Sequence, residues 1–273
     1  MKFDFTGKST AGLRDKKLFL FDMDGTIYID GKLFDGIKEL FDRITATGGK
    51  YVFITNNSSK SRKERAAYLN GLGIPAREDN FMTSTMAAVS ILKKRFGGEK
   101  IYVQATASCV KELKNGGLNV TEDYDESVAA ILVGFDTELT FEKMDRTCKM
   151  LTRTDVPYYA TNPDWCCPVD YGYCPDCGSM CFGYEKSTGK KPIVIGKPNP
   201  FMIDVCVENY GYTREQTLVI GDRIYTDIAS GVNAKTDTLL VLSGECTVKD
   251  LEESDIKPTF VLKNASDLNG IIR

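Results

Sequence analysis

The sequence predicts an α/β protein: a doubly wound parallel sheet with a smaller α/β domain inserted into it. Short apolar runs alternate with single amphipathic stretches, which is typical of a parallel sheet covered by helices on both faces. Several of these runs end abruptly in polar residues. The stretch between residues 57 and 197 is several times longer than one strand-to-strand crossover needs, and this length predicts the insertion.

The first 55 residues predict one strand–helix–strand unit. Lys17–Phe21 and Lys50–Ile54 are short apolar runs of the kind that form buried strands. Between them, apolar residues recur at the three- and four-residue steps of an amphipathic helix, and Gly48-Gly49 ends the stretch. The apolar stripe consists of Phe34, Ile37, Leu40, Phe41 and Ile44.

The same alternation returns near the C-terminal end, where four further strands and a helix over Pro200–Tyr210 are expected. The expected strands are Pro192–Ile195, Thr217–Ile220, Thr238–Leu242 and Thr259–Leu262. A helical stretch, DIASGVNA, precedes the third of them. The connections between parallel strands should be right-handed crossovers.

We therefore assign residues 1–98 and 191–273 to a core domain and residues 99–190 to an inserted domain. The core domain includes the helices expected between Ser61 and Lys94. The inserted domain has strand-like runs in IYVQA, AAILVGF and VPYYATN and a helix over Phe141–Leu151, so it too should be α/β.

Composition excludes several classes of function. The chain has 273 residues, 42% hydrophobic and 27% charged, with a net charge of -3, so no basic field favours nucleic acid or an anionic membrane. The chain contains no histidine, which removes Ser-His and Cys-His nucleophile pairs and His-ligated metals. Catalysis would have to use carboxylates, lysine, a metal or thiols.

We expect a cytoplasmic protein. The N-terminal residues MKFDFTGKSTAGLRDKK lack the apolar core of a signal peptide, and no run approaches the length of a membrane span. Nine cysteines, an odd number in a chain of this size, fit reduced thiols better than a disulfide framework.

Polar residues follow four of the apolar runs. If the strands are parallel, these endings meet at one edge of the sheet, where ligands bind in this fold class. Together they supply carboxylates, an ammonium group, a hydroxyl and amides, which can bind a divalent cation and a phosphate. The endings are Asp22-Met23-Asp24-Gly25-Thr26, Thr55-Asn56-Asn57, Gly196-Lys197-Pro198 and Gly221-Asp222-Arg223.

The carboxylates of this set suggest a mechanism. Asp22 and Asp24 project toward the same side if the strand geometry continues, and Mg²⁺ would neutralise their repulsion with Asp222 as a further ligand. Asp22 is then the nucleophile that forms an aspartyl-phosphate, and Asp24 protonates the leaving oxygen and later activates water. Gly25 permits a close turn at the phosphate.

The remaining residues of the set would bind phosphate. Thr55 and Asn57 offer donors to the phosphate oxygens, and Lys197 offers a positive charge that also keeps Asp22 ionised. Asp227 either orients Lys197 or a metal-bound water, or caps a helix beginning near Ile228.

These segments resemble a known family. KLFLFDMDGTI, FITNNS, IGKP and VIGDRIYTDI resemble, in order, the four motifs of the haloacid dehalogenase-like (HAD) hydrolases. The insertion is similar to the C2 cap of the NagD-like, p-nitrophenylphosphatase-like branch, subfamily IIA. The resemblance implies a Rossmann-like core and a Mg²⁺-dependent phosphatase.

The resemblance also implies roles for individual residues. Asp22 would be the nucleophile and Asp24 the acid/base. Metal ligands would be Asp22, the Asp24 main-chain carbonyl and Asp222, with Thr55, Asn56, Asn57 and Lys197 on phosphate. A small phosphorylated metabolite is the expected partner, and pairing of two copies through the cap is an arrangement that such relatives often adopt.

Other interpretations of the same residues stay open. Asp-Met-Asp-Gly alone could be a surface turn or part of a calcium-binding loop. The calcium-binding alternative fails because the glycine is not at the position that an EF-hand loop requires. The cluster Cys166, Cys167, Cys174, Cys177 and Cys181 could bind zinc, although a second CxxC is missing and free thiols are the commoner outcome.

The cap segment that contains Asn162, Asp164 and Trp165 is either a core anchor and turn or a loop that selects the leaving group; the resemblance favours the second. For the whole protein, the alternatives to a phosphatase are a phosphotransferase and a non-catalytic binding protein with a zinc element.

Overall fold

The computed structural model describes residues 2–169 and 171–272, and it divides the chain into two compact units. The first unit comprises Met1–Thr55, Arg62–Met82 and Lys197–Arg273, and the second comprises Asn56–Ser61 and Thr83–Gly196. Both have strands and helices in alternation, which confirms the predicted α/β class.

The first unit is built on a six-stranded sheet in the order β15-β14-β13-β1-β4-β5. Strand pairs from β15 through to β4 are parallel. The strands are β1 (Leu18–Phe21), β4 (Lys50–Thr55), β5 (Phe81–Thr83), β13 (Thr217–Gly221), β14 (Asp237–Val241) and β15 (Phe260–Leu262). The predicted strands at 17–21, 50–54, 217–220, 238–242 and 259–262 are confirmed within one or two residues.

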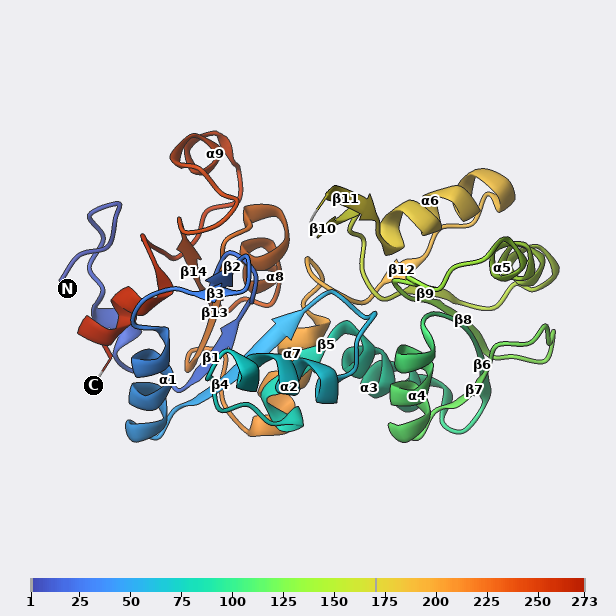
Figure 1. Cartoon of the computed structure of the whole chain (residues 1–273), viewed down its shortest axis with the longest axis horizontal. Helices are drawn as coiled ribbons and strands as arrows, with labels where there is room; N and C mark the ends of the chain where they lie inside the picture. The colour runs from blue at the N-terminus through green and yellow to red at the C-terminus, as the bar shows by residue number, and fades with distance from the viewer. Residues whose placement is uncertain (1, 170, 273) are drawn as a thin grey trace. The chain divides into compact units, whose positions relative to one another are not determined.

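Helices cover both faces of this sheet (Figure 1). Phe19 and Phe21 of β1 point into one buried cluster with Leu40 and Phe41 of α1, while Leu240 and Val261 point into another on the opposite face. Burial on both faces explains why the strands read as continuous apolar runs. The helices are α1 (Ile37–Ala46), α2 (Arg62–Gly71), α7 (Phe201–Tyr210), α8 (Ala229–Asn233) and α9 (Val248–Glu253).

Short elements complete the first unit. A small antiparallel hairpin, β2 (Tyr28–Ile29) and β3 (Lys32–Leu33), follows β1. A π-helical turn, Ile224–Ile228, leads into α8. Short 3₁₀ helices lie at Ala11–Leu13, Glu78–Asn80 and Ala265–Gly270.

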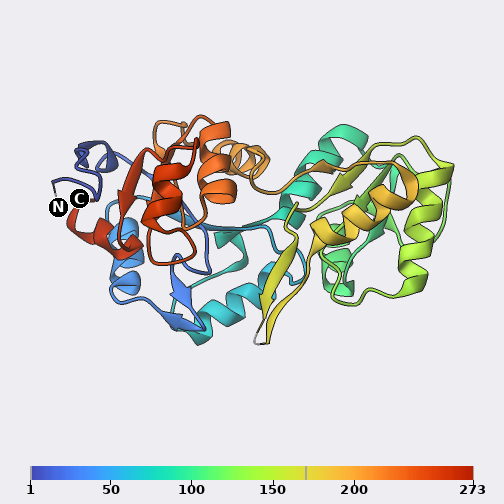
Figure 2. The same ribbon diagram turned by 90° about the horizontal axis from the view of Figure 1, so that it is seen from above.

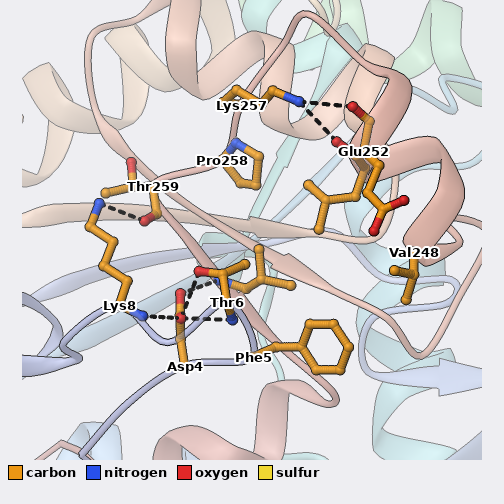
Figure 3. A pocket seen from close by; sticks show the side chains of 11 residues that line it. Asp4, Phe5, Thr6, Lys8, Val248, Glu252, Lys257, Pro258 and Thr259 are labelled. Carbon is orange, nitrogen blue, oxygen red and sulfur yellow. Dashed lines mark hydrogen bonds between the residues drawn. The ribbon is translucent and has the colours of Figure 1, made fainter.

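The N-terminal segment lies against β15, the outer strand of this sheet. The Phe5 amide donates to the Val261 carbonyl at 2.8 Å, and the Val261 amide donates to the Asp4 carboxylate at 3.0 Å. Figure 2 shows the blue N-terminal segment beside the red C-terminal part of the chain. A shallow pocket of about 430 Å³ lies between this segment and α9, lined by Phe5, Val248 and Pro258 among others (Figure 3).

The second unit is built on a five-stranded parallel sheet in the order β12-β9-β8-β6-β7. Helices α5 and α6 lie on one face and α3 and α4 on the other (Figure 1). Its elements are α3 (Ser84–Phe96), β6 (Lys100–Gln104), α4 (Ala107–Asn115), β7 (Asn119–Thr121), β8 (Ala130–Val133), α5 (Phe141–Arg153), β9 (Tyr158–Ala160), α6 (Cys177–Thr188) and β12 (Ile193–Val194).

Side chains at the helix ends explain where these helices begin. Thr83, Thr106 and Thr140 each accept a hydrogen bond from a backbone amide in the first turn of α3, α4 and α5. Such N-caps satisfy amides that have no partner within the helix. An antiparallel hairpin, β10 (Cys166–Val169) and β11 (Gly172–Pro175), precedes α6 and appears in yellow in Figure 2.

Three details differ from the sequence prediction. The strand expected at 192–195 belongs to the second sheet, because β12 pairs with β9. The stretch between Ser61 and Lys94 contains a strand, β5, between its helices α2 and α3. Helix α3 packs against α4, so the second unit begins earlier than the predicted insertion at 99.

None of the helices in the described ranges has both the length and the apolar character that crossing a membrane requires.

Candidate active site

Three neighbouring strands of the first sheet end in the predicted polar residues. β1 lies between β13 and β4 and is parallel to both, so their carboxyl ends lie at the same edge. Asp22 follows β1, Asp222 follows β13, and Thr55 is the last residue of β4. The prediction that these endings meet is confirmed for these strands.

Lys197 joins this edge although the strand before it belongs to the other sheet. Its ammonium nitrogen lies 2.5 Å from Oδ1 of Asp22 and 2.6 Å from Oδ1 of Asp227, and it donates to the Ile54 carbonyl at 3.4 Å. Burial favours the neutral amine, but the charges of Asp22 and Asp227 outweigh it and raise the pKa of Lys197. The side chain is therefore a fixed positive charge at neutral pH.

Asp222 is buried and held from several sides. The Glu245 amide donates to its Oδ2 at 2.7 Å, and the Thr26 hydroxyl lies 3.5 Å from its Oδ1. A methyl group on Gly25, whose φ is +76°, would lie 2.4 Å from the Asp222 carboxylate, so the turn after β1 requires glycine there. Burial and the charge of Asp22 raise the pKa of Asp222 to about 6.

Asp227 contacts Lys197 and does not cap a helix at Ile228. The helical turn begins at Ile224, and the Asp227 carboxylate accepts the Arg223 amide at 3.1 Å as well as the Lys197 ammonium. Burial and the charge of Asp22 raise the pKa of Asp227 to about 7, although Lys197 opposes this shift. The helical turn starts about four residues before the helix that the sequence suggested, and the structure shows the contact of Asp227 with Lys197.

The three carboxylates form a group that suits a hard cation. One oxygen each from Asp22, Asp222 and Asp227 lie within 4.8 Å of one another. Carboxylate oxygens are the preferred ligands of Mg²⁺ and Ca²⁺. The charge of Asp22 raises the pKa of both Asp222 and Asp227, and three carboxylates carry more negative charge than Lys197 alone offsets, so the donor set fits a divalent cation.

Asp24 lies outside this carboxylate group. The residue as a whole is exposed, and its carboxylate accepts a hydrogen bond from the Tyr28 hydroxyl at 3.2 Å. Partial desolvation, and then the charge of Asp22, raise the pKa of Asp24. A carboxyl with a raised pKa beside a carboxylate is suited to proton transfer.

The segment after β4 packs within the second unit. The Asn56 amide donates to Oδ2 of Asp164 at 3.0 Å, and the Asn56 carbonyl accepts the Ser84 hydroxyl at 2.6 Å. Oδ1 of Asn57 accepts the amide and hydroxyl of Ser59, and its Nδ2 lies 3.9 Å from the Cys167 sulfur. The structure thus groups Asn56 and Asn57 with the second unit and Thr55 with the first.

The predicted cap residues have different surroundings. Asn162 is fully buried, and its amide donates to Asp164 and to Asp176, both at 2.9 Å. Asp164 is half-buried and is held by the amides of Asn56 and Asn162. Trp165 is 60% exposed and packs edge-on against Phe182. Asn162 therefore organises the loop, while Asp164 and Trp165 present polar and aromatic groups at its surface.

All nine cysteines are free thiols. Cys177 and Cys181 are buried on α6 with their sulfurs 3.9 Å apart. Cys167 and Cys174 are opposite each other on the β10–β11 hairpin, and Cys166 is exposed.

Sequence reasoning missed two residues at this site. Tyr28 contacts Asp24 from the following hairpin, and its position four residues after Asp24 gave no sign of this. Glu245 contacts Asp222 through its backbone amide, and a backbone donor leaves no pattern of residue types to recognise.

Two family models match the chain. Residues 19–119 match a family described as haloacid dehalogenase-like hydrolase, and residues 194–268 match one described as HAD-hydrolase-like. The matched segments contain the second, third and fourth predicted motifs and all of the first except its two leading residues.

Similar proteins cover almost the whole chain. The acid sugar phosphatase of Staphylococcus saprophyticus is 31% identical over 261 residues, which span 96% of this chain and 98% of the relative. The crystal structure of a 4-nitrophenylphosphatase from Thermotoga maritima has a TM-score of 0.90 and 36% identity, and covers 96% of this chain and 99% of that one. The structure of a glycerol phosphate phosphatase from Mycobacterium tuberculosis in complex with calcium has a TM-score of 0.87 and 26% identity. The match covers 96% of this chain and 76% of that one.

Proposed function

Because the chain belongs to the haloacid dehalogenase-like hydrolases, we propose that it is a Mg²⁺-dependent phosphatase that hydrolyses a small phosphorylated metabolite through an aspartyl-phosphate. Membership of this family confirms the resemblance of the four motifs. The observation that carries the proposal is the meeting of Asp22, Asp222 and Asp227 at one place, where Lys197 contacts Asp22 and Asp227. Carboxylates and one ammonium group are the parts that phosphoryl transfer uses.

In the proposed reaction, Asp22 and Asp24 divide the chemistry. A carboxylate oxygen of Asp22 attacks phosphorus while the bond to the ester oxygen breaks, and Asp24 gives its proton to that leaving oxygen. Asp24 then takes a proton from water, which attacks the same phosphorus and returns Asp22 to its carboxylate form with release of inorganic phosphate. The hydrogen bond from Tyr28 orients Asp24 for both steps.

Asp22, Asp222 and the main-chain carbonyl of Asp24 would hold the cation in this proposal. When bound, Mg²⁺ would offset the negative charge of the phosphate and of the carboxylates. The relative from Mycobacterium tuberculosis was crystallised with calcium, another divalent cation that prefers oxygen ligands. Asp227 supports the site by fixing Lys197 at 2.6 Å.

Thr55, Asn56, Asn57 and Lys197 would bind the phosphate oxygens. Lys197 is already buried and charged beside Asp22, so it needs little reorganisation to stabilise charge on the transferred group. The hydrogen bond between Asn56 and Asp164 ties the segment that carries Asn56 and Asn57 to the cap loop.

A sugar phosphate or similar small polyol phosphate is the substrate class that we propose. The relative from Staphylococcus saprophyticus is named an acid sugar phosphatase, and the one from Mycobacterium tuberculosis a glycerol phosphate phosphatase. Asp164 and Trp165 would contact the leaving group, and Asn162 would hold Asp164 in place. A carboxylate such as Asp164 can accept hydrogen bonds from sugar hydroxyls.

The test of this proposal is phosphate release from 4-nitrophenyl phosphate and a panel of sugar phosphates. Wild-type protein should release phosphate only with Mg²⁺, and EDTA should stop the reaction reversibly. Asp22→Asn should abolish turnover while the circular dichroism spectrum stays unchanged. Asp35→Asn, at an exposed position outside the site, is the matched control and should keep full activity. Undiminished hydrolysis by Asp22→Asn would contradict the mechanism.

A further inference from the structure

The loop after β14 contacts Asp222 through its backbone. The Glu245 amide donates to Oδ2 of Asp222 at 2.7 Å, and the Cys246 amide donates to the Asp222 carbonyl at 3.2 Å. The position of the amide that donates to Oδ2 of Asp222 therefore depends on the position of this loop. A hydrogen bond to an ionised group is stronger than one between neutral groups, so this amide helps to set the orientation of the carboxylate.

The loop approaches Asp222 too closely for any side chain at position 244. A methyl group on Gly244 would lie 2.1 Å from Oδ2 of Asp222. The neighbouring Ser243 hydroxyl donates to the Gly25 carbonyl at 2.8 Å, which joins the loop to the turn after β1. The carboxylate is thus enclosed between two segments, and a shift of the loop would move it.

The side chain of Glu245 is held by two residues from the turn after Asp222. Its Oε2 lies 2.7 Å from Nε of Arg223, and its Oε1 accepts the Tyr225 hydroxyl at 2.8 Å. Both carboxylate oxygens of Glu245 therefore have a partner. Arg223 also follows Asp222 directly in sequence, so the ion pair connects the loop to the residue next to the proposed metal ligand.

The ion pair by itself would add little stability. The side chains of Arg223 and Glu245 are 31% and 48% exposed, and pairs this accessible to water contribute modestly to folding. Its effect on Asp222 is of a different kind, because it fixes the backbone that donates to the carboxylate. Residues that orient metal ligands in this way commonly change metal affinity by about 10- to 100-fold.

We infer that Glu245 is a positioning residue for Asp222: Arg223 and Tyr225 hold its side chain, and its amide orients the Asp222 carboxylate toward a divalent cation. This inference rests on the proposed function, since that function makes Asp222 a metal ligand. In this inference, Glu245 contacts neither the substrate nor the cation.

Isothermal titration calorimetry of metal-stripped, full-length protein with MgCl₂ tests the inference. Glu245→Ala should raise the Mg²⁺ dissociation constant about tenfold. Tyr225→Phe removes one hydrogen bond without changing the charge and should raise it about threefold. Glu253→Gln removes a nearby negative charge outside this chain of contacts and should leave the dissociation constant unchanged. Unfolding midpoints in EDTA check that each variant is folded.

The outcomes separate the inference from the proposed function. Glu245→Ala with wild-type affinity, or an equal loss in Glu253→Gln, would overturn the inference, the second because charge alone would then explain the effect. Wild-type protein that binds Mg²⁺ but hydrolyses no phosphate ester would contradict the proposed function, while the calorimetry still decides the inference. Wild-type protein without Mg²⁺ affinity would overturn both.

Discussion

The ammonium group of Lys197 lies 2.5 Å from Oδ1 of Asp22, although 175 positions separate the two residues in the chain. Lys197 also contacts Asp227 at 2.6 Å, and both Lys197 and Asp227 are almost completely buried. The ammonium group of Lys197 thus balances the charges of the proposed nucleophile and of a second carboxylate in a largely buried site. Both the reaction and the fold should depend on this charge.

Lys197→Met should remove activity and destabilise the protein. Loss of the charge should lower kcat by about 10²–10³, because a donor to the phosphate oxygens is gone. The buried Asp227 is left without its cation, which should cost about 3–5 kcal/mol in the free energy of unfolding. Urea denaturation measures the second effect. Adding Asp227→Asn should recover stability but not activity, and a double variant as unstable as the single one would contradict this account.

Metal-free protein should lose stability as the pH rises through about 6. The folded pKa of Asp222 is about 6, above that of an unfolded aspartate near 4, so the folded state binds more protons between these values. The contribution is therefore present below pH 4 and lost above pH 6, and it amounts to about 3 kcal/mol for this difference in pKa. Urea denaturation in EDTA at several pH values measures it.

Two controls accompany the pH experiment. Asp222→Asn should remove this part of the pH dependence, because the amide does not titrate. Mg²⁺ should restore stability above pH 6, where Asp222 is ionised. A wild-type profile that matches that of Asp222→Asn would show that burial does not perturb this group.

Asp24→Ala should affect poor leaving groups most. A sugar alkoxide needs a proton as it leaves, whereas 4-nitrophenolate leaves readily without one. General acid catalysis contributes about 10²–10⁴, so the loss in kcat/KM should approach this range for sugar phosphates and be much smaller for 4-nitrophenyl phosphate. Steady-state kinetics of the variant with both substrates measures the two losses in kcat/KM. Equal losses for the two substrates would show that Asp24 is not the general acid.

Gly244→Ala should weaken metal binding through a steric effect. The added methyl group would meet the Asp222 carboxylate at 2.1 Å, so either the carboxylate or the loop must move. The Mg²⁺ concentration for half-maximal activity should rise about tenfold. Gly98→Ala is the matched control, because a methyl group there meets nothing within 4 Å. Equal behaviour of the two variants would show that the loop adapts freely.

Thiol reagents should modify Cys166 first. It is exposed, whereas Cys109, Cys177, Cys181 and Cys206 are buried. Burial raises the pKa of Cys109 to about 12, which keeps the unreactive thiol form at neutral pH. Mass spectrometry after brief treatment with iodoacetamide identifies the labelled site, and Cys166→Ser should lose the fast phase. Rapid labelling of Cys109 in the folded protein would contradict the burial of α4.

Much of the candidate site could be predicted because its residues follow strands of one sheet. Asp22, Thr55 and Asp222 each come directly after an apolar run or at its end, and parallel pairing of those runs brings them together. Lys197 lies at the expected place, but the strand before it does not belong to the same sheet, because β12 pairs with β9 in the second sheet. A two-residue strand has too little sequence to indicate which sheet it joins.

Other features depend on contacts that no local pattern encodes. Asn56 is grouped with the second unit because it donates a hydrogen bond to Asp164 and accepts one from Ser84, and both partners lie far along the chain. Asn162 reads as a loop residue in the sequence, and only its full burial shows that it holds Asp164. Strand β5 is too short to give a period-two signal between its flanking helices.

The contact of Asp4 and Phe5 with Val261 also bears on how the protein behaves at high concentration. An uncovered outer strand offers a row of amides and carbonyls onto which another molecule can add its own strand, the first step of amyloid-like growth. Here a side-chain carboxylate takes the place of a neighbouring strand's carbonyl and meets the Val261 amide. The contacts of Asp4 and Phe5 thus cover part of the outer strand and should reduce the addition of a strand from another molecule.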